Sequence, residues 1–222
     1  MAKERLYLID GTALLYRAYN AFREPLRNSR KENTSVPFGF TNSVLGMLKK
    51  EKVDYFAAVF DTAEPTFRHK QYADYKATRK EMPEDMIQQI PRVRAILTAM
   101  NVSSFELAGY EADDIIGTLA RKGESTGLEV MVITSDKDFY QLVTENIKIL
   151  KPKKNAVAEY ELIDIEAVKK ISDVPPDKIT ELMGLVGDTS DNIPGVPKIG
   201  PKTASHLINK YGTIEKTIEN SS

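Results

Sequence analysis

The stretch GYEADDIIGTLARKGESTGLEVMVITSD, residues 109–136, joins a helix to a buried strand. Its first part places an acidic turn ahead of apolar residues at helical spacing, and we expect this helix to end near Gly127. Its second part, EVMVITSD, is a short apolar run typical of a buried strand, and it ends in an acid. Alternating strands and helices of this kind predict an α/β sheet.

Three carboxylates crowd the start of this helix: Glu111, Asp113 and Asp114. Residues three apart share a helix face, so Glu111 and Asp114 should point together, with Asp113 one step round the same end. A helix N-terminus stabilises each carboxylate by roughly 0.3–1 kcal/mol. Two like charges 4 Å apart repel by about 4 kcal/mol at an effective dielectric near 20. The larger repulsion predicts a bound cation, and a solvated acidic first turn is the alternative.

Two other apolar runs also end in an acid. RLYLID ends at Asp10, and YFAAVFD ends at Asp61; the strand of the opening stretch ends at Asp136, with Asp138 two residues on. The carboxyl ends of parallel strands form the functional edge of an open α/β sheet, so we expect these acids to converge there. For Asp10, a role as a helix N-cap is the alternative.

The remaining elements are weaker in pattern. We expect short strands at residues 102–105, 147–151 and 156–161, the last two forming an edge hairpin. We expect helices at residues 13–22 and 38–50, a polar loop at 23–37, and a helix broken at Pro91 within 83–100.

Beyond residue 162 the pattern turns helical, and Pro175 and Pro176 should separate two helices. We therefore predict an α/β domain over residues 1–162 and a helical subdomain over residues 163–222.

The most basic stretch is FRHKQYADYKATRK, residues 67–80, with five Lys or Arg, one His and two Tyr in fourteen residues. If it is helical, one face carries Arg68, Tyr72, Tyr75, Lys76 and Arg79. Cations and aromatics on one face suit phosphates and stacked bases. A solvated surface helix is the alternative.

A second candidate binding segment is the Gly- and Pro-rich loop GDTSDNIPGVPKIGPKTA, residues 187–204. Glycines allow backbone amides to approach a phosphate, and a helix starting at Pro201 would turn its positive end toward that phosphate. A plain turn between helices is the alternative. The candidate phosphate-binding residues are Gly195, Lys198, Gly200, Lys202 and Thr203.

With no cysteine and two histidines, the chain should hold any metal through oxygen. Nine acids are candidate ligands: Asp10, Asp61, Glu111, Asp113, Asp114, Asp136, Asp138, Asp188 and Asp191. They suffice for two hard cations, with Mg²⁺ the natural candidate, and paired cations suit phosphodiester hydrolysis. Setting these nine aside leaves 31 basic residues against 23 acidic ones, a surplus for binding phosphates. A haloacid-dehalogenase phosphatase needs a second Asp where Thr12 stands, which excludes that class.

In chain order, LIDGTALLYRAY, AAVFD, FRHKQYADYKATR, GYEADD, ITSDKDFYQL and GDTSDNIPGVPKIGPKTA resemble the 5′ nuclease domain of the bacterial DNA polymerase I type. Phage 5′ nucleases and flap endonucleases are relatives of that family. The resemblance runs from about Leu6 to Tyr211. It implies a PIN-like Rossmannoid sheet with helices on both faces, followed by a helix-three-turn-helix subdomain.

The resemblance also implies roles for individual residues. One metal cluster is expected around Asp10, Asp61, Glu111 and Asp113, and a second around Asp136, Asp138, Asp188 and Asp191, with Asp114 between or beside them. The ions would be Mg²⁺ or Mn²⁺, and a K⁺ ion often bridges the Gly195–Thr203 hairpin and a duplex phosphate. Arg68, Lys76 and Arg79 match catalytic cations of an arch over the site. Tyr16 matches an aromatic near the scissile nucleotide, and Arg17 and Tyr75 join it as DNA-binding candidates.

We therefore expect a structure-specific 5′-3′ exonuclease and flap endonuclease that acts in replication and repair. Its partners would be duplex DNA with a 5′ flap or nick, an RNA primer, and an attached or associated DNA polymerase. A PIN-type ribonuclease and a non-catalytic DNA-binding scaffold are the alternatives. Relatives of the polymerase type continue beyond residue 222, so we expect a fragment. The sequence has neither an 18-residue apolar run nor an apolar signal core, so we expect a cytoplasmic monomer without a membrane anchor.

Overall fold

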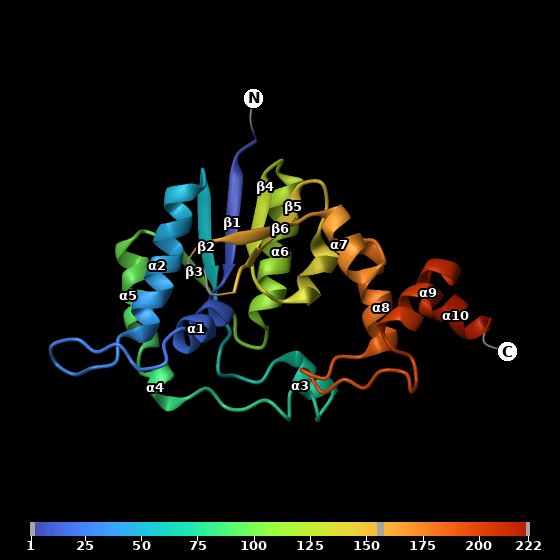
Figure 1. Cartoon of the computed structure of the whole chain (residues 1–222), viewed down its shortest axis with the longest axis horizontal. Coiled ribbons are helices and arrows are strands. Elements are labelled where there is room, and N and C mark those ends of the chain that lie inside the picture. The colour runs from blue at the N-terminus through green and yellow to red at the C-terminus, as the bar shows by residue number, and fades with distance from the viewer. Residues whose placement is uncertain (1–2, 155–157, 221–222) are drawn as a thin grey trace.

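A six-stranded sheet in the order β3-β2-β1-β4-β5-β6 forms the centre of the protein (Figure 1). The computed structural model describes residues 3–154 and 158–220. Only the edge strand β6 runs antiparallel to its neighbour. The strands are β1 (Arg5–Asp10), β2 (Tyr55–Val59), β3 (Ser103–Phe105), β4 (Glu129–Ile133), β5 (Ile147–Pro152) and β6 (Tyr160–Ile163).

Strand β1 lies in the middle of the sheet, between β2 and β4. Its side chains alternate between two cores: Tyr7 and Ile9 belong to one, and Leu8 belongs to the other. Because both faces of the sheet are covered, RLYLID is an almost continuous apolar run and not an alternating one. The last residue of this buried run is Asp10, which brings a carboxylate to the edge of the sheet.

Helices cover both faces of the sheet, as the sequence predicts. One face carries α1 (Gly11–Asn20), α2 (Ser35–Lys50) and α5 (Ile90–Ala99), preceded by the short α4 (Glu84–Ile87). The other carries α6 (Ala112–Ser125) and α7 (Ile165–Ser172). The short 3-10 helix η1 (Lys137–Leu142) follows β4.

The C-terminal part consists of helices that extend from one side of the sheet (Figure 1). They are the 3-10 helix η2 (Pro176–Lys178), α8 (Ile179–Val186), α9 (Pro201–Tyr211) and α10 (Ile214–Glu219). Ile179, Leu182 and Ile208 pack in the same core as Ile116 of α6. The helical pattern after residue 163 is thus confirmed, and the domain boundary at residue 162 stays a prediction.

Several predicted element bounds need correction. The loop expected at residues 23–37 ends earlier, because α2 starts at Ser35 and places Pro37 in its first turn, where a missing backbone N–H costs nothing. The basic stretch is helical only over α3 (Phe67–Gln71), and it continues in turns to residue 79, with Lys76 at a φ of 56°. The condition for one helical face across this stretch, a continuous helix, is therefore not met.

Other expectations are confirmed. Pro91 stands in the first turn of α5, and β5 and β6 form the expected antiparallel edge pair. The second strand of the pair spans Tyr160–Ile163, later in the chain than the expected residues 156–161. Residues 156 and 157 of the last expected strand lie outside the described residues. Within the described part of the chain, no helix combines the length and the apolar character needed to span a bilayer.

Two segments distant in sequence meet beyond the carboxyl ends of the strands (Figure 1). The segment after β2 contains α3, and the loop after α8 spans residues 187–200. The backbone N–H of Lys76 donates to the carbonyl of Asp191 (3.0 Å), and the Asn192 side chain donates to the carbonyl of Asp74 (2.8 Å). These bonds hold both segments over the acidic edge of the sheet.

The two glycines of the predicted phosphate loop differ in what the fold requires of them. A Cβ at Gly195 would lie 2.1 Å from the carbonyl oxygen of Val186, whereas a Cβ at Gly200 would meet no atom within 4 Å. Gly200 is also at an ordinary φ of −92°. Close packing against the end of α8 therefore explains Gly195, while the fold places no such demand on Gly200.

We expect Gly195→Ala to destabilise the protein by about 1–3 kcal/mol, because the new methyl group must displace backbone atoms. Gly200→Ala is the matched control and should leave the melting temperature nearly unchanged. Thermal unfolding followed by circular dichroism measures both variants. Equal melting temperatures for Gly195→Ala and the wild type would contradict the packing role.

Candidate active site

Asp10 ends β1 and caps the helix that follows it. Its Oδ1 accepts a hydrogen bond from the Ala13 backbone N–H (2.8 Å), and its Oδ2 accepts one from the Thr134 hydroxyl (3.1 Å). The side chain is 7% exposed. Burial raises the pKa of Asp10 to about 6, with a contribution from the charge of Asp61, although the bond from Ala13 opposes this. The N-cap alternative and membership of the acidic group thus both hold for this residue.

Asp61 links the end of β2 to the start of α6. Its Oδ1 accepts a hydrogen bond from the Ala112 backbone N–H (2.8 Å), and its own backbone N–H donates to the Thr12 hydroxyl (2.9 Å). Thr12 stands where a haloacid dehalogenase needs an Asp, and in this protein its hydroxyl fixes the backbone at Asp61. Asp61 is exposed, so its second carboxylate oxygen is open to a ligand.

Asp113 is the most strongly perturbed of these carboxyl groups. It lies in the first turn of α6, where burial and the charges of Asp10, Asp136 and Asp61 raise its pKa to about 8. Asp114 is directed elsewhere: it accepts from the Glu111 backbone N–H (3.0 Å) and pairs with Arg68. Asp113 therefore lies among other carboxylates, whereas its neighbour Asp114 is paired with a cation.

A second set of acids surrounds η1. Asp136 caps η1 by accepting from the Asp138 backbone N–H (2.9 Å). Burial, together with the charges of Asp136 and Asp188, raises the pKa of Asp138 to about 7. The Oδ1 atom of Asp138 is buried without a hydrogen-bond partner. An unsatisfied carboxylate oxygen of this kind requires a ligand or a proton.

Asp188 sits in the loop after α8 and is stabilised in its charged form. Burial opposes ionisation, but hydrogen bonds from Ser190 and the charge of Lys137 outweigh it and hold the pKa of Asp188 below its usual value. The Ser190 backbone N–H lies 2.7 Å from Oδ1, and Lys137 Nζ lies 3.3 Å from Oδ2. This acid is therefore a carboxylate at neutral pH.

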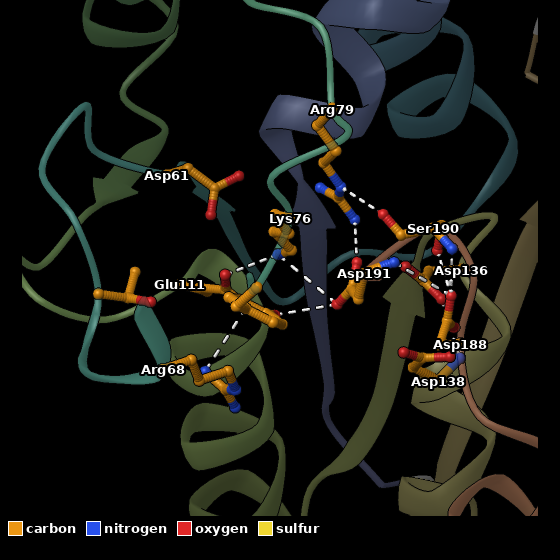
Figure 2. Close-up of polar contacts among 12 residues, drawn as sticks. Asp61, Arg68, Lys76, Arg79, Glu111, Asp136, Asp138, Asp188, Ser190 and Asp191 are labelled. Atoms are coloured by element: carbon orange, nitrogen blue, oxygen red, sulfur yellow. Dashed lines mark hydrogen bonds and ion pairs between the residues drawn. The ribbon is translucent and has the colours of Figure 1, made fainter. Parts of the chain in front are cut away.

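The three predicted arch cations contact the acids directly (Figure 2). Arg68 makes two 2.8 Å bonds to Asp114. Lys76 Nζ lies 2.6 Å from Glu111 Oε1 and 3.9 Å from Asp191 Oδ2. Arg79 Nη2 donates to Asp191 (2.6 Å). Although the stretch is not one helix, its turns still direct all three cations into the acidic group.

Tyr75 lies between the two segments. Its hydroxyl is 3.0 Å from Glu111 Oε2 and 2.9 Å from Asp191 Oδ2, and the residue is 5% exposed. Burial and the charge of Glu111 raise the pKa of this hydroxyl. Its single proton must therefore be shared between two carboxylates. The Tyr75 ring is covered in this arrangement, and its expected contact with DNA stays a prediction.

Charge interactions and hydrogen bonds connect acids of the two expected metal clusters, and the assignment of ligands to each cluster stays a prediction. Asp136 acts on Asp10 and Asp113, and Glu111 is joined to Asp191 through Lys76 and Tyr75. Among the residues that the structure describes, no three acidic or histidine side chains are placed to hold an ion as they stand. Protein cations are paired with four of the nine acids, Glu111, Asp114, Asp188 and Asp191, which is a physical reason for this.

The donor set nevertheless fits hard divalent cations. All candidate ligands are carboxylates, which Mg²⁺ and Mn²⁺ prefer. Burial and the charges of neighbouring carboxylates raise the pKa values of Asp10, Asp113 and Asp138, and Asp138 has an unpartnered oxygen. A cleft of about 1020 Å³ opens beside them, lined in part by Asp113, Asp138 and Asp188.

The remaining predicted residues lie outside this group. Lys198, Gly200, Lys202 and Thr203 are exposed at the start of α9, and Lys198 has a φ of 67°. Tyr16 is half-buried against the core beneath α1. Arg17 donates to the Lys153 carbonyl near β5.

Sequence reasoning missed Thr134, Thr12, Lys137 and Ser190. Thr134 could have been found from the sequence Thr134-Ser135-Asp136. A Thr hydroxyl often accepts a hydrogen bond from the backbone N–H two residues later, which forms a side-chain turn.

Comparison with protein families gives two adjacent matches. Residues 5–172 match the family described as 5′-3′ exonuclease, N-terminal resolvase-like domain, and residues 174–222 match 5′-3′ exonuclease, C-terminal SAM fold. A 5′-3′ exonuclease from Aquifex aeolicus is 39% identical over 97% of this chain and 72% of its own length. DNA polymerase I of Bacillus subtilis is 39% identical over 98% of this chain. The chain spans 24% of that polymerase.

Solved structures share the fold at low sequence identity. The T5 D15 protein co-crystallised with metal ions has a TM-score of 0.77 at 19% identity, covering 98% of this chain and 79% of that one. The catalytic core of Rad2 in complex with DNA substrate has a TM-score of 0.65 at 19% identity, covering 98% of this chain and 65% of that one.

We expect Asp113→Asn to stabilise the metal-free protein, and more so at higher pH. A carboxyl pKa raised from roughly 3.9 in the unfolded chain to about 8 when folded gives stability that is full at pH 4 and is lost as the pH rises through 8. An asparagine at position 113 cannot ionise, so the variant keeps this stability at high pH. In EDTA, the melting temperature of Asp113→Asn should exceed that of the wild type most at pH 8 and least near pH 5. A lower melting temperature for the variant at pH 8 in EDTA would contradict the proposed repulsion.

Proposed function

Because the chain belongs to the 5′-3′ exonuclease family, we propose that it hydrolyses phosphodiester bonds of DNA at 5′ flaps and nicks, and of RNA primers, with divalent cations. The observation that carries the proposal is the convergence of Asp10, Asp113 and Asp136 at the carboxyl edge of the sheet. Because these carboxylates repel one another, a bound cation would stabilise them. Solved relatives of the same fold were crystallised with metal ions or with DNA.

The acids are the proposed ligands, and Mg²⁺ or Mn²⁺ the proposed ions. Divalent cations at such a site favour phosphodiester hydrolysis by stabilising charge on the attacking and leaving oxygens. The chain itself contributes the orientation of the ligands: backbone amides fix one oxygen each of Asp10, Asp61 and Asp136. The proposed first set of ligands is Asp10, Asp61, Glu111 and Asp113. The charges of Asp10, Asp61 and Asp136 all act on Asp113, which supports Asp136 as a neighbouring ligand.

Arg68, Lys76 and Arg79 are the proposed catalytic cations. They are bound to acids at distances of 2.6–2.8 Å. Lys76 and Arg79 are held by Glu111 and Asp191. A cation bound at these two acids would release both side chains, which could then turn toward a substrate phosphate. Cations aimed at the reacting phosphate act where negative charge develops in the transition state.

The start of α9 is the proposed duplex-binding surface. The first backbone amides of an α-helix have no partner within the helix, and α9 is an 11-residue helix that starts directly after Gly200. A Cβ added at Gly200 would meet no atom within 4 Å, so this end of the helix is not crowded at Gly200. Lys198 and Lys202 add charge beside it. A K⁺ ion between this loop and a duplex phosphate is part of the proposal, as are DNA contacts by Tyr16 and Arg17.

The wider biological setting is also proposed. The polymerase relatives support a role in replication and repair beside a DNA polymerase, since the chain matches about a quarter of their length. A cytoplasmic location and a monomeric state complete the proposal.

The decisive experiment is cleavage of a 5′-labelled flap duplex with Mg²⁺ and with EDTA. We expect cleavage near the flap junction with Mg²⁺ alone, and its loss in Asp113→Asn, because a neutral amide is a poor ligand for a hard cation. Cleavage in excess EDTA, or at the wild-type rate in the variant, would contradict the proposed chemistry.

A substrate panel separates the alternatives. Preference for single-stranded RNA over flap DNA would indicate a PIN-type ribonuclease. Binding of the flap duplex without cleavage in Mg²⁺ or Mn²⁺ would indicate a DNA-binding scaffold. The control for Asp113→Asn in the cleavage experiment is Glu145→Gln, which also changes an acid to its amide. Glu145 lies in the β4–β5 connection, outside the candidate ligand set.

We expect the double variant Lys198→Ala/Lys202→Ala to bind duplex DNA more weakly while its saturated single-turnover rate stays near that of the wild type. Each lost phosphate contact should lower the slope of log affinity against log salt by roughly 0.9. Fluorescence anisotropy at several salt concentrations measures this. The matched control is Lys52→Ala, at the amino edge of the sheet. If affinity and salt slope both survive, the loop is only a structural turn.

A further inference from the structure

Thr134 is a buried polar residue that the proposed chemistry does not use. It follows β4 directly, is 2% exposed, and is positioned between two of the acids. Its hydroxyl donates to Asp10 Oδ2 (3.1 Å) and accepts from the Asp136 backbone N–H (3.1 Å). These two bonds connect the carboxyl ends of β1 and β4.

We propose that Thr134 is a positioning residue for the divalent-cation site, an inference that rests on the proposed function. The chemistry of the two partners determines the direction of each hydrogen bond of the Thr134 hydroxyl. The Asp136 backbone N–H can only donate, so the hydroxyl proton of Thr134 must go to Asp10. Thr134 thus fixes the side chain of one proposed ligand and the backbone of another through a single oxygen atom.

Asp10 is held at both of its oxygens as a result. Oδ1 accepts from the Ala13 backbone N–H (2.8 Å) and Oδ2 accepts from Thr134. Two donors on opposite oxygens fix the plane of the carboxylate, so that the remaining lone pairs point in set directions. Orientation of this kind governs how well a carboxylate binds metal.

The backbone ladder cannot perform this task for Asp136. The pairing of β1 with β4 ends at Ile9 and Ile133, which places Thr134 at the next position, opposite Asp10. Asp136 lies beyond the last pair and has no partner in the ladder. The Thr134 hydroxyl replaces the missing ladder bond and sets the position of Asp136 relative to Asp10.

The chain contains a matched control for the purely structural part of this arrangement. Thr144 accepts from the backbone N–H two residues later, that of Asn146 (3.1 Å), and its hydroxyl donates to the carboxylate of Glu124. The same local turn and the same hydroxyl-to-carboxylate bond therefore occur at a site outside the acidic group. Loss of the Thr144 hydroxyl should therefore lower the stability of the folded protein and leave metal binding unchanged.

The experiment measures metal affinity without substrate, by isothermal titration of Mn²⁺ into the whole chain. Thr134→Val keeps the shape and removes the hydroxyl, and we expect Mn²⁺ affinity to fall by about 10-fold or more. Thr134→Ser restores the hydroxyl and should restore the affinity. Thr144→Val should lower the melting temperature while Mn²⁺ affinity stays at the wild-type value.

The outcomes separate this inference from the proposed function. Wild-type Mn²⁺ affinity in Thr134→Val would overturn the positioning role and leave the proposed function standing. Equal losses in Thr134→Val and Thr134→Ser would also overturn it, because the hydroxyl would not be the cause. A wild-type chain that binds no Mn²⁺ would overturn both. Should Thr134→Val fail to fold, the smaller Thr134→Ala removes the same hydroxyl and is judged by the same affinity criterion.

Discussion

Repulsion among carboxylates at the carboxyl edge of the sheet is the constraint on which the site depends. The structure offsets it in two ways. Backbone amides bind Asp10, Asp61, Asp136 and Asp188. Side-chain cations bind Glu111, Asp114 and Asp191, and Lys137 adds a second partner for Asp188. The remaining two acids, Asp113 and Asp138, have raised pKa values of about 8 and 7. The unmet demand for positive charge is therefore concentrated where these two side chains lie.

The cations come from a segment that is also bonded to the helical part of the chain. Lys76 contributes its side chain to Glu111 and its backbone N–H to the Asp191 carbonyl. The loop that carries Asp191 leaves α8 and leads to α9. The same loop is bonded to the basic stretch through Asn192 and Asp74 as well. It therefore connects the acidic cleft with the proposed duplex-binding surface.

Local pattern was enough to predict the sheet and the acids at its edge. RLYLID, YFAAVFD and EVMVITSD are buried strands because their apolar residues must leave water, and a parallel sheet places all their carboxyl ends together. Pro91 and the glycine after α6 marked helix ends through backbone sterics that act within a few residues. The same local rules failed for the basic stretch after Phe67, where contacts with the residue 187–200 loop replace helical hydrogen bonds beyond Gln71.

The partners of each side chain were decided by the tertiary structure alone. Tyr75 is buried because Glu111 and Asp191, 36 and 116 residues away in sequence, both reach its hydroxyl. Asp136 acts on Asp10 and Asp113. Thr134 binds Asp10, which is 124 residues away in sequence, and so links it to Asp136. The sequence by itself determined which residues carry charge and which strands deliver them to one edge. Which acid meets which cation depends on distances between segments that no local pattern encodes, since charge interactions act through space and not along the chain.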